Sequence, residues 1–472
     1  MTSEETLASL FRQWAGMPCT ESLSVGANGS NRSYWRMTSS TGLHCIGAYN
    51  DDVRENEAFF YYCHALRERG VNVPELYAVS DDRKYYLQQD LGDTTLYSYM
   101  FDRRKTGRGF DAEILNLYKR VLDDLVQMQV AGRDMDFTHA YPRSDFDRQS
   151  ILWDLNYFKY YYMKLTYVPF DEELLEQDFS RLSDYLTDTD CGFFLYRDFQ
   201  SRNIMLYEDT PYYIDFQGGR RGAAQYDVAS LLYSAKSDIP EAIRQELLDH
   251  YIHTLAQHYP IDKADFRQRF YAYVRIRIMQ ALGAYGYRGL YERKNYFIDS
   301  IPLALNNLRM IVENHPLPVK LPHLEQVWRA LSARSIGTMP PESEGLTVEV
   351  GSFSYKRGLP QDSSGNGGGF IFDCRALPNP GRYPEYRTYT GKDRPVVKFL
   401  QDTPAVKYFL TAAKQMVGPS IKRYLERNFT HLSVYFGCTG GRHRSVYCAE
   451  QLAEWISENF DCHVFLNHRE QQ

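Results

Sequence analysis

Three polar residues near the middle of the chain have the types and the spacing needed to transfer a phosphoryl group. The segment 194–206 reads FLYRDFQSRNIML, and after a short turn the segment 212–217 reads YYIDFQ. Apolar runs flank a polar loop, which predicts two short strands with Asp198, Asn203 and Asp215 at their ends. Phosphoryl transfer from a nucleotide needs a carboxylate for the acceptor hydroxyl and oxygen ligands for Mg²⁺. The segment therefore predicts such a site, with three polar residues in an ordinary hairpin as the alternative.

The same block resembles the catalytic segment of the aminoglycoside phosphotransferase family of small-molecule kinases. The D-x-x-x-x-N spacing followed by a strand-borne Asp is typical of kinase catalytic loops. The most similar branch acts on the anomeric hydroxyl of N-acetylmuramate and N-acetylglucosamine, and it shares YRDFQSRN at 196–203, IDFQ at 214–217 and YD at 226–227. Tyr196 stands where the family usually has His, at a position that packs the loop.

The resemblance implies a role for each polar residue of the block. Asp198 is the expected catalytic base, and Asn203 and Asp215 are the expected Mg²⁺ ligands. Arg197 and Asp227 are expected to have structural roles at the site, with Asp227 bracing the loop. The implied cofactors are ATP and Mg²⁺.

Two segments upstream of this block are predicted to bind ATP. The segment 24–32 contains a Gly-bearing turn between strands, and Gly lets backbone N–H groups approach phosphates closely. The segment 85–93, YYLQQDLGD, resembles the family's hinge, whose main chain would bind the adenine edge. A plain hairpin turn is the alternative for 24–32. The predicted ATP-binding residues are Gly29, Ser30, Asn31, Arg32, Gln88, Gln89 and Asp90.

One cationic residue that kinases place on an N-terminal strand is missing. Such a strand usually supplies a Lys to the phosphates, but the first Lys of this chain is Lys84. The amino-sugar branch also tends to lack this Lys, and Arg32 or Arg36 is the candidate replacement. Glu57 lies where kinases place the ion-pair partner of that Lys, with a solvated surface position as its alternative.

Length and composition favour a multidomain globular protein. The 472 residues suffice for two or three domains, and a charged content of 24% is ordinary. The sequence contains no run of about 18 apolar residues, so no membrane span is predicted. Its start lacks the basic region of a signal peptide. The 8 cysteines are scattered without C-x-x-C pairs, which favours a reducing cytoplasm over disulfides or a zinc site.

The predicted fold class is an α+β protein-kinase-like two-lobed domain followed by a smaller α/β domain. The first domain covers 1–334, with an N-lobe over about 20–90 and a helical C-lobe over about 94–334. Pro-Pro and small polar residues predict a linker over 335–345. The second domain covers 346–472 and has 16 Lys and Arg against 12 Asp and Glu.

The second domain has a phosphate-binding pattern of its own. An apolar strand at 432–436 runs into GCTGGRHRSV at 437–446, and a helix follows. Backbone N–H groups, a helix N-terminus and three basic side chains would converge on one anion, most naturally a phosphate. A structural turn is one alternative, and cysteine-phosphatase chemistry through C-x-x-x-x-x-R is another. The predicted binding residues are Cys438, Thr439, Gly440, Gly441, Arg442, His443, Arg444 and Ser445.

Residues 348–468 resemble the C-terminal domain of the RNase adapter RapZ. The matching pieces include FSYKRGLP, FDCR, LPNP, TGKD and the loop 437–446. The resemblance implies an α/β domain that binds small regulatory RNAs and glucosamine-6-phosphate. The P-loop kinase half of RapZ has no counterpart, since the sequence contains no G-x-x-x-x-G-K-[ST].

Together these observations predict a small-molecule kinase. It would phosphorylate a hydroxyl of an amino sugar, plausibly the anomeric hydroxyl of N-acetylmuramate or N-acetylglucosamine in peptidoglycan recycling, and its C-terminal domain would sense a sugar phosphate. The alternative is a regulatory nucleotide-binding pseudokinase with an RNA-binding adapter tail, which would make small RNA the partner. The missing Lys favours that alternative, whereas the intact Asp198, Asn203 and Asp215 set favours the enzyme. A cytoplasmic location without membrane contact is expected in either case.

Overall fold

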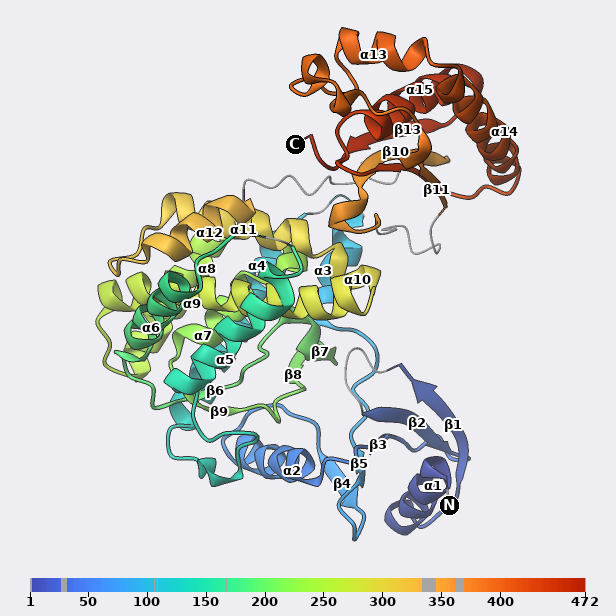
Figure 1. Cartoon of the computed structure of the whole chain (residues 1–472). Coiled ribbons are helices and arrows are strands. Elements are labelled where there is room, and N and C mark those ends of the chain that lie inside the picture. Colours follow the sequence, from blue (N-terminus) through green and yellow to red (C-terminus); the bar gives the residue numbers. More distant parts are fainter. Residues whose placement is uncertain are drawn as a thin grey trace. The chain divides into compact units, whose positions relative to one another are not determined.

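The structure is a computed structural model that describes residues 2–26, 32–105, 107, 109–166, 168–332, 345–360 and 369–471. Contacts between Cα atoms divide the chain into two units, Met1–Arg334 and Ser335–Gln472 (Figure 1). Among the described residues, no helix is both long enough and apolar enough to cross a membrane. The first unit has a sheet-based lobe and a helical lobe.

The sheet-based lobe is a five-stranded antiparallel sheet with the order β1-β2-β3-β5-β4. Helix α1 (Ser3–Ala15) packs around Leu87, whereas α2 (Val53–Glu68) belongs to the cluster that contains Tyr86. Since successive side chains of a strand point to opposite faces, the two helices cover opposite faces of the sheet. The strands are β1 Cys19–Val25, β2 Ser33–Ser39, β3 His44–Tyr49, β4 Leu76–Val79 and β5 Tyr85–Gln88.

The helical lobe is built around α9 (Lys263–Tyr285), most of which is buried. Two short antiparallel pairs, β6 with β9 and β7 with β8, lie within this lobe and frame the polar loop. Their bounds are β6 Phe193–Leu195, β7 Ile204–Tyr207, β8 Thr210–Tyr213 and β9 Arg220–Gly222. The remaining helices are α3 Leu96–Lys105, α4 Ala112–Ala131, α5 Arg148–Phe158, α6 Glu172–Thr187, α7 Gln225–Leu232, α8 Glu241–His258, α10 Asn295–Ile298, α11 Ile301–Asn314 and α12 Pro322–Ser332.

Two π-helical segments extend helices of this lobe: η2 (Lys159–Met163) follows α5, and η5 (Gly286–Tyr291) follows α9. They contact each other through Tyr161 and Tyr287, whose ring centroids are 5.0 Å apart. The absence of a side chain on Gly286 permits this approach, because an added Cβ would lie 1.8 Å from the carbonyl oxygen of Tyr161.

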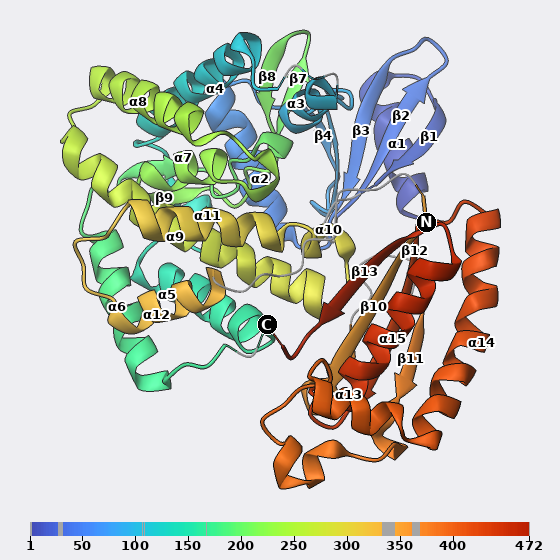
Figure 2. The ribbon, with the colours of Figure 1, turned by 90° about the horizontal axis from the view of Figure 1, so that it is seen from above.

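The second unit contains a parallel four-stranded sheet with the order β11-β12-β10-β13. All residues of β10 and nearly all of β12 are buried, as expected for inner strands of a parallel sheet. Helix α15 packs along β10, β12 and β13 (Figure 2). The bounds are β10 Thr347–Ser354, β11 Phe370–Asp373, β12 His431–Cys438, β13 His463–His468, α13 Arg394–Gln401, α14 Pro404–Glu426 and α15 Arg444–Asn459.

Candidate active site

The polar loop between β6 and β7 meets the end of β8. The backbone N–H of Ile214 donates to the carbonyl oxygen of Asn203 at 3.0 Å, which sets the two segments side by side. The amide Nδ2 of Asn203 then donates to the carbonyl oxygen of Asp198 at 2.9 Å and to Oδ2 of Asp215 at 3.2 Å. The structure therefore brings the three residues of the predicted transfer site together through one side chain.

Two residues of this site have a left-handed backbone conformation that only Gly adopts without cost. Arg197 has φ of 85° and Asp215 has φ of 69°. The carboxylate of Asp227 holds the first of these turns, accepting from the backbone N–H of Tyr196 at 2.7 Å and of Arg197 at 3.0 Å. Asp227 is fully buried, and this burial raises its pKa to about 7 although the two amide donors act in the opposite direction. Asp227 thus braces the loop, in the position that the resemblance implied.

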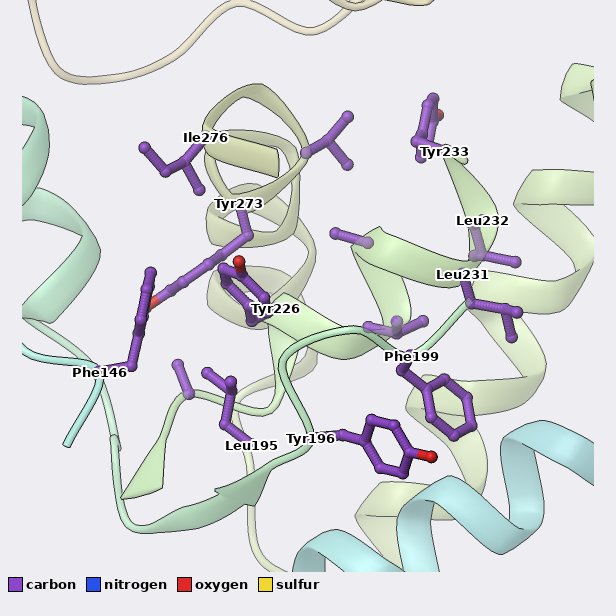
Figure 3. Packing of buried hydrophobic residues seen from close by; sticks show 14 of the residues in the cluster. Phe146, Leu195, Tyr196, Phe199, Tyr226, Leu231, Leu232, Tyr233, Tyr273 and Ile276 are labelled. Carbon is purple, nitrogen blue, oxygen red and sulfur yellow. The ribbon is translucent and has the colours of Figure 1, made fainter. Parts of the chain in front are cut away.

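Tyr196 packs the loop against the apolar core of the helical lobe, as Figure 3 shows. Its buried ring meets the edge of the Phe199 ring at a centroid distance of 5.2 Å, and its hydroxyl donates to the carbonyl oxygen of Ile214. Tyr196 thereby also ties the loop to the strand that leads into Asp215.

A buried network of guanidinium groups supports the loop from the helical lobe. Arg197 forms a bidentate pair with Asp154 of α5 at 2.6 and 2.8 Å, and it donates to the hydroxyl of Tyr226 at 2.6 Å. Arg277 of α9 donates to the same hydroxyl at 2.9 Å and lies 3.6 Å from Oδ1 of Asp198. Asp154 and Arg277 were not assigned roles from the sequence. A charged residue within the apolar run YVRIRIM of α9 was the available signal for Arg277.

The donor set of the site fits Mg²⁺, which prefers oxygen ligands and retains several waters. Part of Asp215 is exposed to solvent, but protein surrounds the rest of the residue. Desolvation by this protein, and then the charge of Asp198, raise the pKa of Asp215 to about 6. Because Asn203 donates through Nδ2, its Oδ1 is the atom that can face a cation. Among the described residues, no three His, Cys, Asp or Glu side chains gather as a metal centre. The carboxylate of Asp215 and the amide oxygen of Asn203 would therefore hold Mg²⁺ together with water and phosphate oxygens.

Arg32, one of the two candidates to replace the missing Lys, has its partners on α2. Its buried side chain is 3.4 Å from the carboxylate of Glu55 on α2, and its guanidinium lies over the ring of Phe59. Its charge also lowers the pKa of Asp215, against the larger effect of desolvation. The ion pair between the sheet and α2 thus uses Arg32 and Glu55.

The other candidates for this ion pair have different partners. Glu57 pairs with Arg83 at 2.5 Å, and both side chains are about half exposed, which agrees with the solvated surface position that the sequence left as its alternative. Arg36 forms a bidentate contact with Asp90 at 2.6 and 3.0 Å, and it also contacts Asp93. Arg32 thus differs from Arg36 in that its charge acts on Asp215.

The predicted adenine-binding segment follows β5. Gln88 pairs with Ile46 of β3, and the backbone N–H of Gln89 donates to the carbonyl oxygen of Glu75 at 2.8 Å. The side chain of Asp90 is buried against Arg36, so recognition of a base here would use the main chain. The predicted phosphate-binding residues of the upstream turn, Gly29, Ser30 and Asn31, lie outside the described residues.

In the second unit, the three basic side chains that were predicted to bind an anion have backbone partners. Arg442, His443 and Arg444 each donate to backbone carbonyl groups of the segment 375–388, because that segment packs against the start of α15. The acceptors are Thr388 for Arg442 at 3.0 Å, Tyr386 for His443 at 3.2 Å, and Arg375 and Leu377 for Arg444 at 2.8 and 2.9 Å.

The loop between β12 and α15 nevertheless directs polar groups at Cys438. Its thiol lies 3.2 Å from the hydroxyl of Ser445. Burial opposes ionisation, but hydrogen bonds from the side chain and backbone of Ser445, the charge of Arg444 and a hydrogen bond from the backbone of Gly441 outweigh it and lower the pKa of Cys438. Thr439 and Gly440 are exposed at the tip of the loop. The side chains that could face a phosphate here are therefore those of Cys438, Thr439 and Ser445, with the backbone N–H groups of the loop.

An antiparallel sheet covered by α2, a helical lobe, and an Asp–Asn–Asp site at the strand ends define a protein-kinase-like phosphotransferase fold. Residues 23–262 match the family described as "Phosphotransferase enzyme family", and residues 346–472 match the "RapZ C-terminal domain". The chain belongs to this phosphotransferase family and carries a RapZ-type C-terminal domain.

Individual relatives share only parts of the chain. A nucleotide-binding protein from Thermosipho melanesiensis is 41% identical over 140 residues, which are 30% of this chain and 48% of that protein. A nucleotide-binding protein from Acidithiobacillus ferrooxidans is 31% identical over 221 residues, which are 44% of this chain and 72% of that protein. The chain spans about half the length of the first of these relatives. Choline kinase from Cryptosporidium parvum superposes with a TM-score of 0.47 at 10% identity, over 69% of this chain and 99% of that chain.

Proposed function

We propose that the chain is an ATP- and Mg²⁺-dependent kinase of an amino sugar. The observation that carries this proposal is the Asn203 side chain, which joins the main chain of Asp198 to the carboxylate of Asp215. A base and two oxygen ligands at this separation are the parts that phosphoryl transfer to a hydroxyl requires. N-acetylmuramate and N-acetylglucosamine are the proposed acceptors, by the likeness of the loop 196–203 to the amino-sugar branch, and peptidoglycan recycling in the cytoplasm is the proposed context.

Each residue of the site would have a distinct task. Asp198 is half-exposed and would accept the proton of the acceptor hydroxyl, while Arg277, 3.6 Å away, would hold its carboxylate in place. Asn203 and Asp215 would hold Mg²⁺, which neutralises charge on the phosphates when bound. Arg32 would provide the positive charge next to the phosphates that a Lys provides in other kinases. The upstream turn and the main chain of residues 88–90 would bind the nucleotide.

The C-terminal domain would bind a sugar phosphate at the loop 438–445. The thiol of Cys438, the hydroxyl of Ser445 and the backbone N–H groups surround one point at the N-terminus of α15, an arrangement that suits a phosphate. A sugar phosphate at this loop would let the second domain report on the same class of sugar that the first domain phosphorylates.

A regulatory nucleotide binder with an RNA-binding tail is the second candidate, and the absence of a Lys from β3 favours it. The two candidates differ in turnover. We would measure ADP release with Mg²⁺-ATP over N-acetylmuramate, N-acetylglucosamine, glucosamine, an aminoglycoside and choline. Release stimulated by an amino sugar supports the kinase, and stimulation by choline or the aminoglycoside alone overturns the acceptor class. ATP binding without release for any acceptor supports the regulatory binder.

A further inference from the structure

Arg220 of β9 is a buried cation whose terminal nitrogens have no hydrogen-bond partner among the residues that the structure describes. Its side chain is 7% exposed, and its single hydrogen bond runs from Nε to the carbonyl oxygen of Gly218 at 3.0 Å. The guanidinium group of Arg197 lies close enough to repel it. Burial, and then this repulsion, lower the pKa of Arg220 to about 10, so the group remains protonated at neutral pH. Retaining an unpaired buried charge costs stability unless an anion binds it.

The carboxylates in the neighbourhood already have other partners. Both oxygens of Asp154 accept from Arg197, and both oxygens of Asp227 accept from backbone N–H groups. Asp198 faces Arg277 and is the residue assigned to the acceptor hydroxyl. Asp154 and Asp198 therefore act on Arg220 through charge alone, and its terminal nitrogens stay available to an added oxyanion.

The position of Arg220 in the sheet places its positive charge next to the transfer site. In the β6–β9 pair it lies opposite Leu195, three residues before Asp198, and its charge interacts with Asp198 and Asp154. Its neighbour Arg221 points the other way: it is exposed, lies over the ring of Phe137 and pairs with Asp145 at 3.6 Å.

We propose that Arg220 binds an oxyanion at the transfer site, and this inference rests on the proposed kinase function. The chemistry is that of a planar guanidinium whose two terminal nitrogens are free to donate side by side, which matches the oxygens of a phosphoryl group or of a carboxylate. Two sources can supply these oxygens: the terminal phosphate of the nucleotide, or a carboxylate on the acceptor. N-acetylmuramate carries such a carboxylate, whereas N-acetylglucosamine does not.

Calorimetric titration separates the two sources without requiring turnover. For the nucleotide, the paired probes are Mg²⁺-AMP-PNP and Mg²⁺-ADP, which differ in the terminal phosphate. For the acceptor, the pair is N-acetylmuramate and N-acetylglucosamine, each titrated into protein that is saturated with Mg²⁺-AMP-PNP. The variants are Arg220→Ala and Arg220→Lys, with Arg221→Ala as the matched control. Arg220→Gln replaces Arg220→Ala if the latter does not fold.

We expect wild-type protein to bind one probe of one pair more tightly, either Mg²⁺-AMP-PNP over Mg²⁺-ADP or N-acetylmuramate over N-acetylglucosamine. Arg220→Ala should lower the affinity for that preferred probe by about 10- to 100-fold. Arg220→Lys should restore part of it, because a single ammonium keeps the charge but loses the planar pair of donors. Arg221→Ala should bind as wild type does. Loss confined to the nucleotide pair identifies the terminal phosphate as the oxyanion, and loss confined to the acceptor pair identifies the carboxylate.

The inference is overturned if neither pair shows a preference in wild type, or if Arg220→Ala keeps the preference. Thermal melting provides a second readout, because removal of an unpaired buried cation should not lower the melting midpoint. A large drop in the midpoint with unchanged affinities would assign Arg220 a purely structural role. Binding that depends on Arg220 in a protein without turnover would refute the kinase and leave the oxyanion site standing.

Discussion

The pair between Arg197 and Asp154 permits a quantitative test of how the catalytic loop is held. Both side chains are largely buried, with exposed fractions of 16% and 9%, and the contact is bidentate. Replacing Asp154 by Ala leaves the guanidinium of Arg197 buried, with the Tyr226 hydroxyl as its remaining side-chain acceptor among the described residues. Removal of one partner from a buried ion pair costs roughly 3–5 kcal/mol.

The first unit has 334 residues and an unfolding entropy of about 0.7 kcal/mol/K, so a loss of this size corresponds to a fall in melting temperature of roughly 4–7 °C. The matched control is Asp184→Ala, which breaks the pair of Asp184 with Arg148 at 2.7 Å, where the side chains are 61% and 47% exposed. An exposed pair contributes about 0–1 kcal/mol, so the control should melt within roughly 1.5 °C of wild type. Urea unfolding followed by far-ultraviolet circular dichroism gives the same comparison as a free energy.

Activity should respond to the same change, because Arg197 precedes Asp198 and has the strained φ of 85°. At a temperature where the variant is folded, Asp154→Ala should lower kcat more than it raises the KM for ATP. The double variant Arg197→Met with Asp154→Leu should regain much of the stability, since matched apolar side chains often replace a buried pair without loss. Equal melting temperatures for Asp154→Ala and Asp184→Ala would refute the reasoning.

Three further outcomes follow from single contacts. Because Asp215 has a pKa of about 6, above the ordinary value of 3.8, Mg²⁺ affinity should fall about tenfold per pH unit below pH 6 in calorimetric titrations, and a flat profile would count against Asp215 as ligand. Because the pKa of Asp215 is higher in the folded protein than in the unfolded chain, the folded state binds a proton at Asp215 more tightly. Protonation of Asp215 should therefore raise the free energy of unfolding as pH falls from 6 towards 4. Gly286→Ala should lower the melting temperature, because its Cβ would meet a carbonyl oxygen of η2 at 1.8 Å, whereas Gly218→Ala makes an ordinary contact at 3.7 Å and should not. Arg32→Ala should raise the KM for ATP by roughly tenfold, and the surface variant Arg83→Ala should leave it unchanged; the opposite result would exclude Arg32 as the replacement for Lys.

The sequence was sufficient to locate the transfer site because its parts are local. Asp198 and Asn203 lie in one loop, and Asp215 follows after a single hairpin, so strand pairing alone brings them together. The two-lobed fold and the α/β class of the second domain were predicted from the family resemblances. The bounds of strand β1 were not predicted, since its alternating Ser, Thr and Glu residues leave no apolar run.

The supporting charges could not be read from the sequence because their partners are far away along the chain. Asp154 and Arg277 meet the loop only after α5 and α9 have packed, and Arg220 resembles any other strand arginine until its neighbours are known. The backbone partners of Arg442, His443 and Arg444 could not be predicted for a related reason. A basic side chain near a helix N-terminus can bind an anion or a backbone carbonyl, and the segment 375–388 supplied the carbonyls.

The role of Asp198 is the central claim, and a single-turnover measurement with radiolabelled ATP tests it most directly. Wild-type protein and Asp198→Asn would each be mixed in excess with labelled ATP, Mg²⁺ and the acceptor found by the panel, and label in the sugar would be followed over time. The account predicts ATP affinity unchanged within about twofold and a transfer rate lower by about 10²- to 10⁴-fold, the usual contribution of a general base. Transfer by Asp198→Asn at the wild-type rate would contradict it.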